Sequence, residues 1–215
     1  MMNQGSISEG SRAWEIAATA LGLFSQKGYA GTSMLDIARA AKVGKSTLYS
    51  HYATKEALFR AATYIWTRTK IARLRDFIAA FDGPLVKLKA LGDYVENAVD
   101  APNQDAARMF VDFLGQSLIE GGALYNQSHY LMEEMRKAPQ IIEEVLLDGV
   151  AQGVFKPQIA PAAGRLAINL ISYIDGLIFR GVLLDREINA REQMTLYLEH
   201  LTATCLLTPE PVKTT

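Results

Sequence analysis

Side chains that can hydrogen-bond to a ligand are concentrated in the segment VGKSTLYSHY, residues 43–52. If this segment forms a short helix, one face of that helix is almost free of large apolar residues. That face carries Lys45, Ser46, Thr47, Tyr49, Ser50 and His51. A protein core cannot use such a face, whereas the phosphates and base edges of a DNA groove can bond to it. These residues therefore indicate contact with double-stranded DNA.

Each of these side chains has an ordinary interpretation as well as a DNA-binding one. Lys45 alone is a solvated lysine, but its ammonium can also bond guanine or a phosphate. Ser46 and Thr47 suit phosphates or a base edge, while Tyr49 and Lys55 suit the DNA backbone. Lys55 would stand at a helix N-terminus, where backbone amides already favour an anion. Their occurrence together, on one short helix and at the start of the next, favours DNA.

A second motif in the same segment points elsewhere and has to be weighed. Residues 44–47, GKST, resemble the end of a phosphate-binding loop. The full pattern requires a glycine at position 39 and an apolar strand before it. Position 39 is Arg39, and no such strand precedes it. The sequence therefore argues against a nucleotide-binding loop.

No group of side chains points to catalysis. The histidines, His51, His129 and His200, are scattered, and none is clustered with cysteine or carboxylates at metal-ligand spacing. The single cysteine, Cys205, has no evident activating neighbour and is expected to be a small packing residue. We therefore expect no enzyme activity, no bound metal and no cofactor.

A helical scaffold is expected to hold the polar segment. Helical periodicity runs through almost the whole chain, and the alternating pattern of strands does not occur. We expect a first helix at 11–27 that ends at Gly28. A short second helix should begin after Ser33, which acts as its N-cap, and a third should lie at 45–52. Three such helices, the last two short and tightly joined, predict a helix-turn-helix. Its small core should contain Ile16, Phe24, Ile37, Ala38, Val43, Leu48 and Tyr52.

The rest of the chain also predicts only helices, so the expected fold class is all-α with about nine helices. Thr54 should cap a long fourth helix that runs to about Phe81. Pro139 should kink or split the segment 124–153, because proline lacks a backbone N–H and crowds the preceding turn. The remaining helices are expected at 85–100, 104–121, 162–184 and 189–207.

Composition and charge are those of a globular protein with an uneven charge distribution. Hydrophobic residues make up 49% of the 215 residues and charged residues 21%. Residues 1–60 hold seven Lys/Arg and four Asp/Glu, whereas the remainder holds 15 and 19. A basic head on an acidic body suits one domain near phosphates and another away from them. One cysteine and an N-terminus without a signal peptide fit the reducing cytoplasm.

The N-terminal part of the chain contains a longer pattern, formed by Arg12, IAA (16–18), LF (23–24), GY (28–29), TS (32–33), IA (37–38), Ala41, Val43, TLY (47–49), HY (51–52), KE (55–56) and LF (58–59). This pattern resembles the TetR family of bacterial transcription regulators. The resemblance implies operator contacts at Ser33, Lys45, Ser46, Thr47, Tyr49, His51 and Lys55. Two positions depart from the family pattern: Lys42 replaces a usual turn glycine, and Gly44 replaces a usual capping serine. A non-glycine in a left-handed turn costs about 1 kcal/mol.

The resemblance also implies a division of labour along the chain. We expect a helix-turn-helix DNA-binding domain at 11–55, a ligand-binding and dimerisation domain at 56–207, and flexible tails at 1–10 and 208–215. Residues 166–184 are apolar around nearly the whole helix, which requires burial on two sides. The helices at 162–184 and 189–207 should therefore form half of a four-helix homodimer interface, without a membrane span.

Aromatic residues between the DNA-binding head and these helices are expected to line an inducer cavity. For any single aromatic residue the core is the more common role. By resemblance, the helices enclose a largely apolar pocket with a few polar groups. The candidate ligand-binding residues are Trp66, Tyr94, Phe110, Phe113, Tyr130 and Tyr173. This set suggests a hydrophobic or aromatic effector.

Two hypotheses for function follow. In the first, the chain is a homodimeric, ligand-responsive transcription regulator, a repressor that binds a palindromic operator and is released by a small effector. In the second, it is an all-helical small-molecule-binding protein or enzyme whose N-terminal head is only structural. The first predicts duplex binding that weakens steeply with salt, and the second predicts none. The polar outward face of residues 45–51 favours the first.

Overall fold

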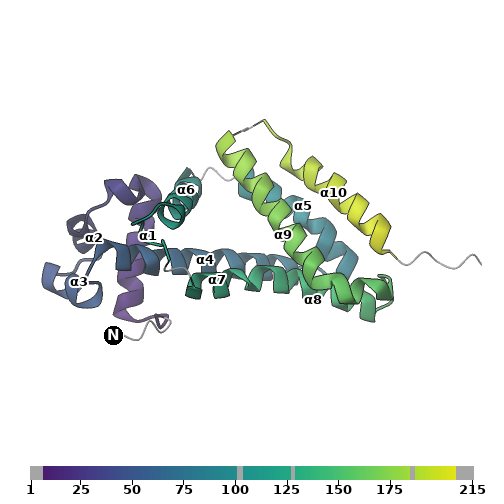
Figure 1. Ribbon diagram of the computed structural model, residues 1–215, viewed down its shortest axis with the longest axis horizontal. Coiled ribbons are helices and arrows are strands. Elements are labelled where there is room, and N and C mark those ends of the chain that lie inside the picture. Colours follow the sequence, from purple (N-terminus) through teal and green to yellow (C-terminus); the bar gives the residue numbers. More distant parts are fainter. Residues whose placement is uncertain (1–6, 101–103, 127–128, 185–186, 207–215) are drawn as a thin grey trace, which may run out of the picture. The chain divides into compact units, whose positions relative to one another are not determined.

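The computed structural model describes residues 7–100, 104–126, 129–184 and 187–206, and these are almost entirely helical (Figure 1). Within those ranges the backbone pairs like a strand only at an isolated bridge between Phe155 and Leu206. The helices are α1 (Arg12–Gly31), α2 (Met34–Ala40), α3 (Lys45–His51), α4 (Lys55–Ala79), α5 (Pro84–Asp100), α6 (Gln104–Leu118), α7 (His129–Met135), α8 (Lys137–Ala151), α9 (Ala163–Phe179) and α10 (Ala190–Cys205). A 3-10 helix at Pro157–Ala162 precedes α9, and a π-helical stretch at Arg180–Leu184 follows it. The expected all-α fold is confirmed. The expected tails fall mostly outside the described residues.

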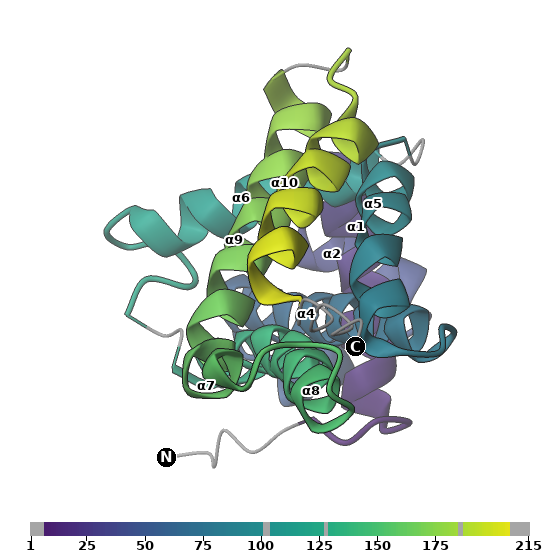
Figure 2. The same ribbon diagram turned by 90° about the vertical axis from the view of Figure 1, so that its right-hand side faces the viewer.

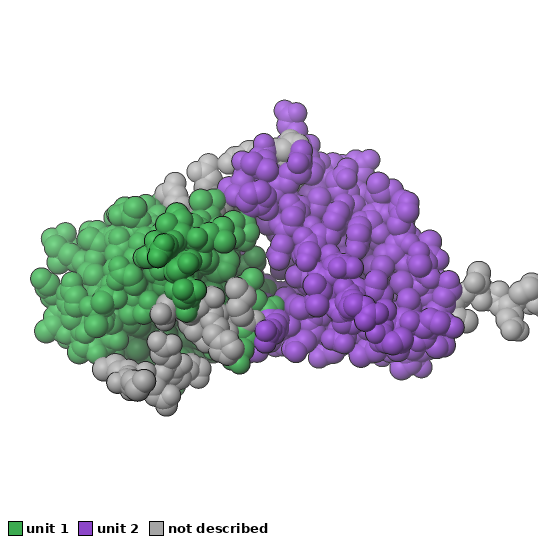
Figure 3. Space-filling model, viewed as in Figure 1, with its two compact units in different colours: residues 1–70, 102–135 green, residues 71–101, 136–215 purple. Residues whose placement is uncertain are grey.

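The chain forms two compact units, coloured separately in Figure 3. The first comprises Met1–Lys70 and Pro102–Met135, and the second comprises Ile71–Ala101 and Arg136–Thr215. Helices α1 to α3, the first part of α4, α6 and α7 therefore belong to the first unit. The end of α4, α5 and α8 to α10 belong to the second.

The core of the first unit is built on the helix-turn-helix. Every residue expected in that small core is buried except Val43, which is half-buried and packs against it. α6 and the start of α4 enlarge the core with Leu58, Phe59, Met109 and Phe113. Because α6 packs against α1, residues far apart in sequence stabilise the head (Figure 1).

The second unit is a bundle in which α5 packs against α10 and α8 packs against α9 (Figure 2). Gly92 of α5 faces α10, where an added Cβ would lie 3.5 Å from Thr195 Oγ1. Arg191 of α10 pairs with Asp93 at 2.5 Å and with Glu96 at 3.3 Å. In α8, Gly149 lies directly under the ring of the fully buried Phe155.

Local sequence signals explain most helix ends. Gly28 adopts φ 77° and ψ 166°, which interrupts α1 and leaves a short turn at 29–31. Thr54 Oγ1 accepts the Ala57 N–H at 3.2 Å and caps α4, as expected. The segment around Pro139 is split, but the division falls at Arg136, so Pro139 stands in the first turn of α8. A first turn tolerates proline because its N–H groups need no intrahelical acceptor.

The most apolar helical stretch is buried on one side only. Pro157–Leu184 is the single stretch of the described residues that is long and apolar enough to cross a membrane, which is weak evidence of a span. α9 buries a stripe formed by Ala163, Ala167, Leu170, Ile174 and Leu177. Ile168 remains 55% exposed on the other side, and Asp175 is exposed as well. The bundle therefore covers one side of α9, and Asp175 lies on the side that stays exposed.

Candidate nucleic-acid interface

α3 presents the polar face that the sequence predicts. Lys45, Ser46, Thr47, Tyr49, Ser50 and His51 are all exposed. Leu48 is fully buried and anchors the helix in the core of the first unit. α3 therefore offers hydroxyl, ammonium and imidazole groups to solvent along one side.

The turn between α2 and α3 is held by backbone hydrogen bonds and by an arginine from α1. The Val43 N–H donates to the Ala38 carbonyl at 3.0 Å, and Arg12 donates to the Ala41 carbonyl at 3.2 Å. Lys42 adopts φ 52°, the left-handed conformation that its place in the turn predicts. Gly44 is the N-cap of α3 and makes no side-chain cap. Because no side chain caps the N-terminal end of α3, the hydrogen-bonded turn before it holds that end in place.

The C-terminal end of α3 is tied to α1. The Tyr52 hydroxyl donates to the Ala13 carbonyl at 2.9 Å, and the ring is buried. Burial raises the pKa of Tyr52 to about 12. The hydroxyl therefore stays protonated and keeps donating throughout the neutral range.

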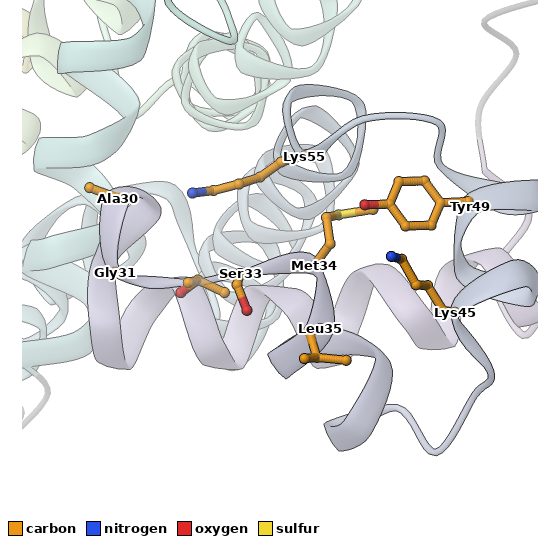
Figure 4. A pocket seen from close by; sticks show the side chains of 9 residues that line it. Ala30, Gly31, Ser33, Met34, Leu35, Lys45, Tyr49 and Lys55 are labelled. Atoms are coloured by element: carbon orange, nitrogen blue, oxygen red, sulfur yellow. The ribbon is translucent and has the colours of Figure 1, made fainter.

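A hollow of about 510 Å³ lies beside the polar face and is lined by four of the candidate residues, Ser33, Lys45, Tyr49 and Lys55 (Figure 4). Lys45 and Tyr49 of α3 line it together, with the Lys45 Nζ 5.9 Å from the centre of the Tyr49 ring. Lys55 lines it from the start of α4, with its ammonium directed toward Ala30 and away from Lys45 and Tyr49. The hollow thus has two ammonium groups and a phenol at its edge, which are donors suited to a phosphate.

Ser33 is the N-cap of α2 in a complete capping box. Its hydroxyl donates to the Asp36 carboxylate at 2.6 Å, and the Asp36 N–H donates back to the Ser33 oxygen at 3.1 Å. The hydroxyl bond from Ser33 is the main reason that the pKa of Asp36 is lowered. In this arrangement the Ser33 proton points to Asp36 instead of to the hollow.

Lys55 is held by a tyrosine that the sequence reasoning did not single out. The Lys55 Nζ lies 4.4 Å from the centre of the Tyr29 ring, and the Tyr29 hydroxyl donates to Glu56 Oε1 at 3.1 Å. Burial, and then the nearby Glu56 carboxylate, raise the pKa of Tyr29 to about 12. The Tyr29 N–H donates to the Asp112 carboxylate of α6 at 2.6 Å. Only the GY motif at 28–29 could have drawn attention to Tyr29, and no local pattern marks Asp112.

The candidate ligand-binding residues fall into separate clusters. Trp66, Phe110 and Phe113 gather in the first unit, with ring centres 6.0–6.5 Å apart. In the second unit Tyr94 packs on Phe77, and Tyr173 stacks on Tyr197 at 4.3 Å. Burial, and then Asp175, raise the pKa of Tyr94. The side chain of Tyr130 lies outside the described residues.

Among the described residues, no group of three or more His, Cys, Asp or Glu side chains is arranged to hold a metal ion. The Cys205 thiol is buried, and burial raises its pKa. The exposed donors of α3 and of the neighbouring hollow are therefore the most prominent concentration of ligand-binding groups that the geometry offers.

Comparison with known proteins agrees with the fold and with this site. Residues 16–62 match the model of bacterial regulatory proteins of the tetR family, and residues 93–191 match that of the tetracyclin repressor-like C-terminal domain. The chain belongs to the TetR family of bacterial transcription regulators. It is a transcription regulator with a helix-turn-helix and a C-terminal ligand-binding domain.

Individual relatives are distant. The HTH-type transcriptional repressor KstR2 of Mycobacterium tuberculosis is 24% identical over 149 residues, which cover 69% of this chain and 72% of the relative. The IcaR negative regulator of the biofilm operon of Staphylococcus epidermidis is 44% identical over 46 residues, 21% of this chain and 25% of the relative. These relatives are regulators of transcription and not enzymes.

Solved structures share the fold at low sequence identity. A putative TetR-family regulator from Mesorhizobium loti has a TM-score of 0.71 at 17% identity and covers 91% of this chain and 97% of its own. A TetR regulator from Chloroflexus aurantiacus has a TM-score of 0.68 at 22% identity, with coverage of 92% and 97%.

Proposed function

We propose that the protein is a cytoplasmic homodimeric repressor that binds a palindromic operator through α3 and is released by a small hydrophobic effector. The exposed polar face of α3, with Lys45, Tyr49 and Lys55 around one hollow, is the observation that carries the proposal. A helix of this kind fits the major groove of duplex DNA, and its flanking cations fit the phosphates on either side.

Individual roles follow from position. Ser46 and Thr47 lie near the N-terminus of α3, the end that reaches base edges in helix-turn-helix proteins. Lys45, Tyr49, His51 and Lys55 are assigned to the phosphates, which set affinity and salt dependence. Ser33 joins them if its hydroxyl proton turns from Asp36 to a phosphate.

Symmetric pairing is part of the proposal because one short helix reads too few base pairs for a specific site. α9 and α10 are the proposed interface. α9 leaves Ile168, Asn169, Ser172 and Gly176 exposed on one side, and α10 leaves Leu196 51% exposed. Small and aliphatic side chains on one helix face permit close approach of a second helix pair.

The effector is proposed to contact the Trp66, Phe110 and Phe113 cluster of the first unit. One relative is named a transcriptional repressor and another a negative transcriptional regulator, which supports repression as the direction of regulation. The effector would favour a conformer with weaker operator affinity, a coupling that is typically about 1–3 kcal/mol.

The decisive experiment is selection of bound sites from random duplex DNA, followed by titration of the selected operator with variants. Lys45→Ala and Tyr49→Ala should each weaken binding about tenfold and keep the thermal unfolding transition. Lys89→Ala, an exposed lysine of α5, is the matched control and should bind like the parent. A parent protein that binds no duplex at low salt would refute the proposal. A compound screen for release from the same operator then tests the effector.

A further inference from the structure

Tyr29 joins three elements of the first unit at one residue. It follows Gly28, whose φ of 77° and ψ of 166° interrupt α1. A break of this kind leaves the next N–H groups without intrahelical acceptors. The Tyr29 N–H is satisfied by the Asp112 carboxylate of α6 at 2.6 Å. The buried Thr32 hydroxyl closes the same turn by donating to the Gly28 carbonyl at 2.8 Å.

The Tyr29 side chain reaches the first two residues of α4. Its ring packs edge-on against Phe59, with centres 4.8 Å apart, and the Lys55 ammonium lies over the ring, 4.4 Å from its centre. Its hydroxyl donates to Glu56 Oε1 at 3.1 Å. Hydrogen bonds from its own backbone N–H and from the Thr54 side chain hold the Glu56 carboxylate in place. The same bonds lower its pKa. Tyr29 is therefore held at both ends and contacts Lys55 with its face.

We propose that Tyr29 is a positioning residue for the contact between Lys55 and a DNA phosphate, and that Asp112 of α6 fixes Tyr29 in place. The inference rests on the proposed operator binding and goes beyond it, because it makes a phosphate contact at the head depend on a residue of α6. Phe110 and Phe113, the candidate effector contacts, are on the same stretch of α6 as Asp112. Movement of that stretch would therefore be transmitted to Lys55.

The physical basis is preorganisation of a flexible cation. A lysine side chain has four rotatable bonds and loses much of its conformational freedom when its ammonium binds a phosphate. The electron-rich face of an aromatic ring attracts the ammonium and restricts it before DNA arrives. If Asp112 releases the turn that carries Tyr29, the ring moves and the lysine regains its freedom. The loss then appears in DNA binding and not only in stability.

The test is a double-mutant cycle between Asp112 and Lys55, two residues that both contact Tyr29. Operator affinity and its salt dependence are measured for the parent, Asp112→Ala, Lys55→Ala and the double variant. We expect each single variant to weaken binding about five- to tenfold and to reduce the salt slope by about 1, as for one lost phosphate contact. The double variant should bind no worse than Lys55→Ala alone. A purely structural role for Asp112 would leave the salt slope unchanged and make the two losses multiply.

Conservative variants serve as controls. Asp112→Asn keeps an oxygen that can accept the Tyr29 N–H, and Tyr29→Phe keeps the ring under Lys55, so both should keep the parent's salt slope. Thermal unfolding of each variant shows whether it is folded. If Asp112→Ala shows no cooperative transition, the cycle is run with Tyr29→Leu in its place and the same outcomes apply.

The outcomes separate this inference from the proposed function. Parent-like slopes for Asp112→Ala, or multiplying losses in the cycle, overturn the role of Tyr29 while operator binding stands. A parent protein that binds no duplex overturns both.

Discussion

Lys42 shows how a single residue can occupy a conformation that its side chain disfavours. It lies in the turn before α3 with φ 52°, and its side chain is exposed. The turn requires this conformation, because the Val43 N–H must reach back to the Ala38 carbonyl at 3.0 Å. A left-handed residue with a Cβ is strained, whereas glycine adopts the same backbone without a clash.

Replacing Lys42 with glycine should therefore stabilise the first unit. The relief of strain exceeds the extra flexibility of glycine in the unfolded chain, for a net gain of about 0.5–1 kcal/mol. Thermal unfolding followed by circular dichroism would show it as a higher Tm. The same exchange at Lys27, an exposed helical position of α1, is the matched control and should cost about 1 kcal/mol. A lower Tm for Lys42→Gly contradicts the strain argument.

Tyr52 makes stability dependent on pH in the alkaline range. Its folded-state pKa is raised by burial to about 12 from the ordinary 10.0, so the folded state retains the proton more strongly. Its contribution is complete below pH 10.0 and is lost as the pH rises through the folded value. Tyr52→Phe should cost about 1 kcal/mol at neutral pH through the lost bond to the Ala13 carbonyl. It should also make the alkaline loss shallower, because the variant lacks one of the buried phenols whose pKa is raised.

Urea unfolding at neutral and alkaline pH measures both effects. Equal alkaline slopes for parent and variant would show that Tyr52 is not the titrating group.

Which residues were predictable from sequence depends on the range of the interactions that place them. Ser33 as a cap and Leu48 as a core residue follow from patterns within a few residues, whereas the turn position of Lys42 follows from the family resemblance. The structure confirms all three. Asp112 is 83 residues from its partner Tyr29. A contact of that length is fixed by the packing of α6 on α1, which no local pattern encodes.

At the scale of elements, helix ends were easier to predict than helix neighbours. Gly28, Thr54 and Pro139 each act on their own turn, so their effects were foreseeable. The exact place of the split near Pro139 also has a local cause. It falls at Arg136, because proline fits the first turn of α8. By contrast, the packing of α5 against α10 joins segments that are far apart in sequence, and no local pattern predicts which helices become neighbours.

Gly149 is the element-scale position where the backbone approach is tightest. A Cβ there would overlap the ring of the fully buried Phe155, which cannot move without opening the core of the second unit. Gly149→Ala should therefore destabilise by about 1–3 kcal/mol, despite the better helix propensity of alanine. Denaturant unfolding measures the change.

Two further variants isolate the cause. Gly115→Ala in α6 meets nothing within 4 Å and should be neutral or slightly stabilising. Phe155→Leu combined with Gly149→Ala should cost less than the sum of the two single changes. An additive double variant would contradict the overlap.

At the scale of the whole molecule, the unpaired face of α9 is the feature that a single chain leaves unexplained. The stretch Pro157–Leu184 is apolar enough to be a membrane candidate, yet only 28% of its most apolar window is buried. An apolar helix with one covered side is expected to find a partner for the other. A second copy of the chain provides one and also provides the second recognition helix that a palindromic site requires.

Ile168→Asp tests the proposed dimer and its link to DNA in one variant. Ile168 is 55% exposed on α9, so an aspartate there is tolerated in a single chain but is desolvated without a partner charge in a two-fold interface. We expect light scattering to show a fall from two chains to one, each of 23.6 kDa. Operator affinity should fall at least about a hundredfold, because a single helix-turn-helix no longer gains from the second one bound to the same operator. Val86→Asp, at a 50% exposed position of α5, carries the same charge away from the interface and should leave mass and affinity unchanged. A dimer that survives Ile168→Asp with full operator binding would place the interface on another face.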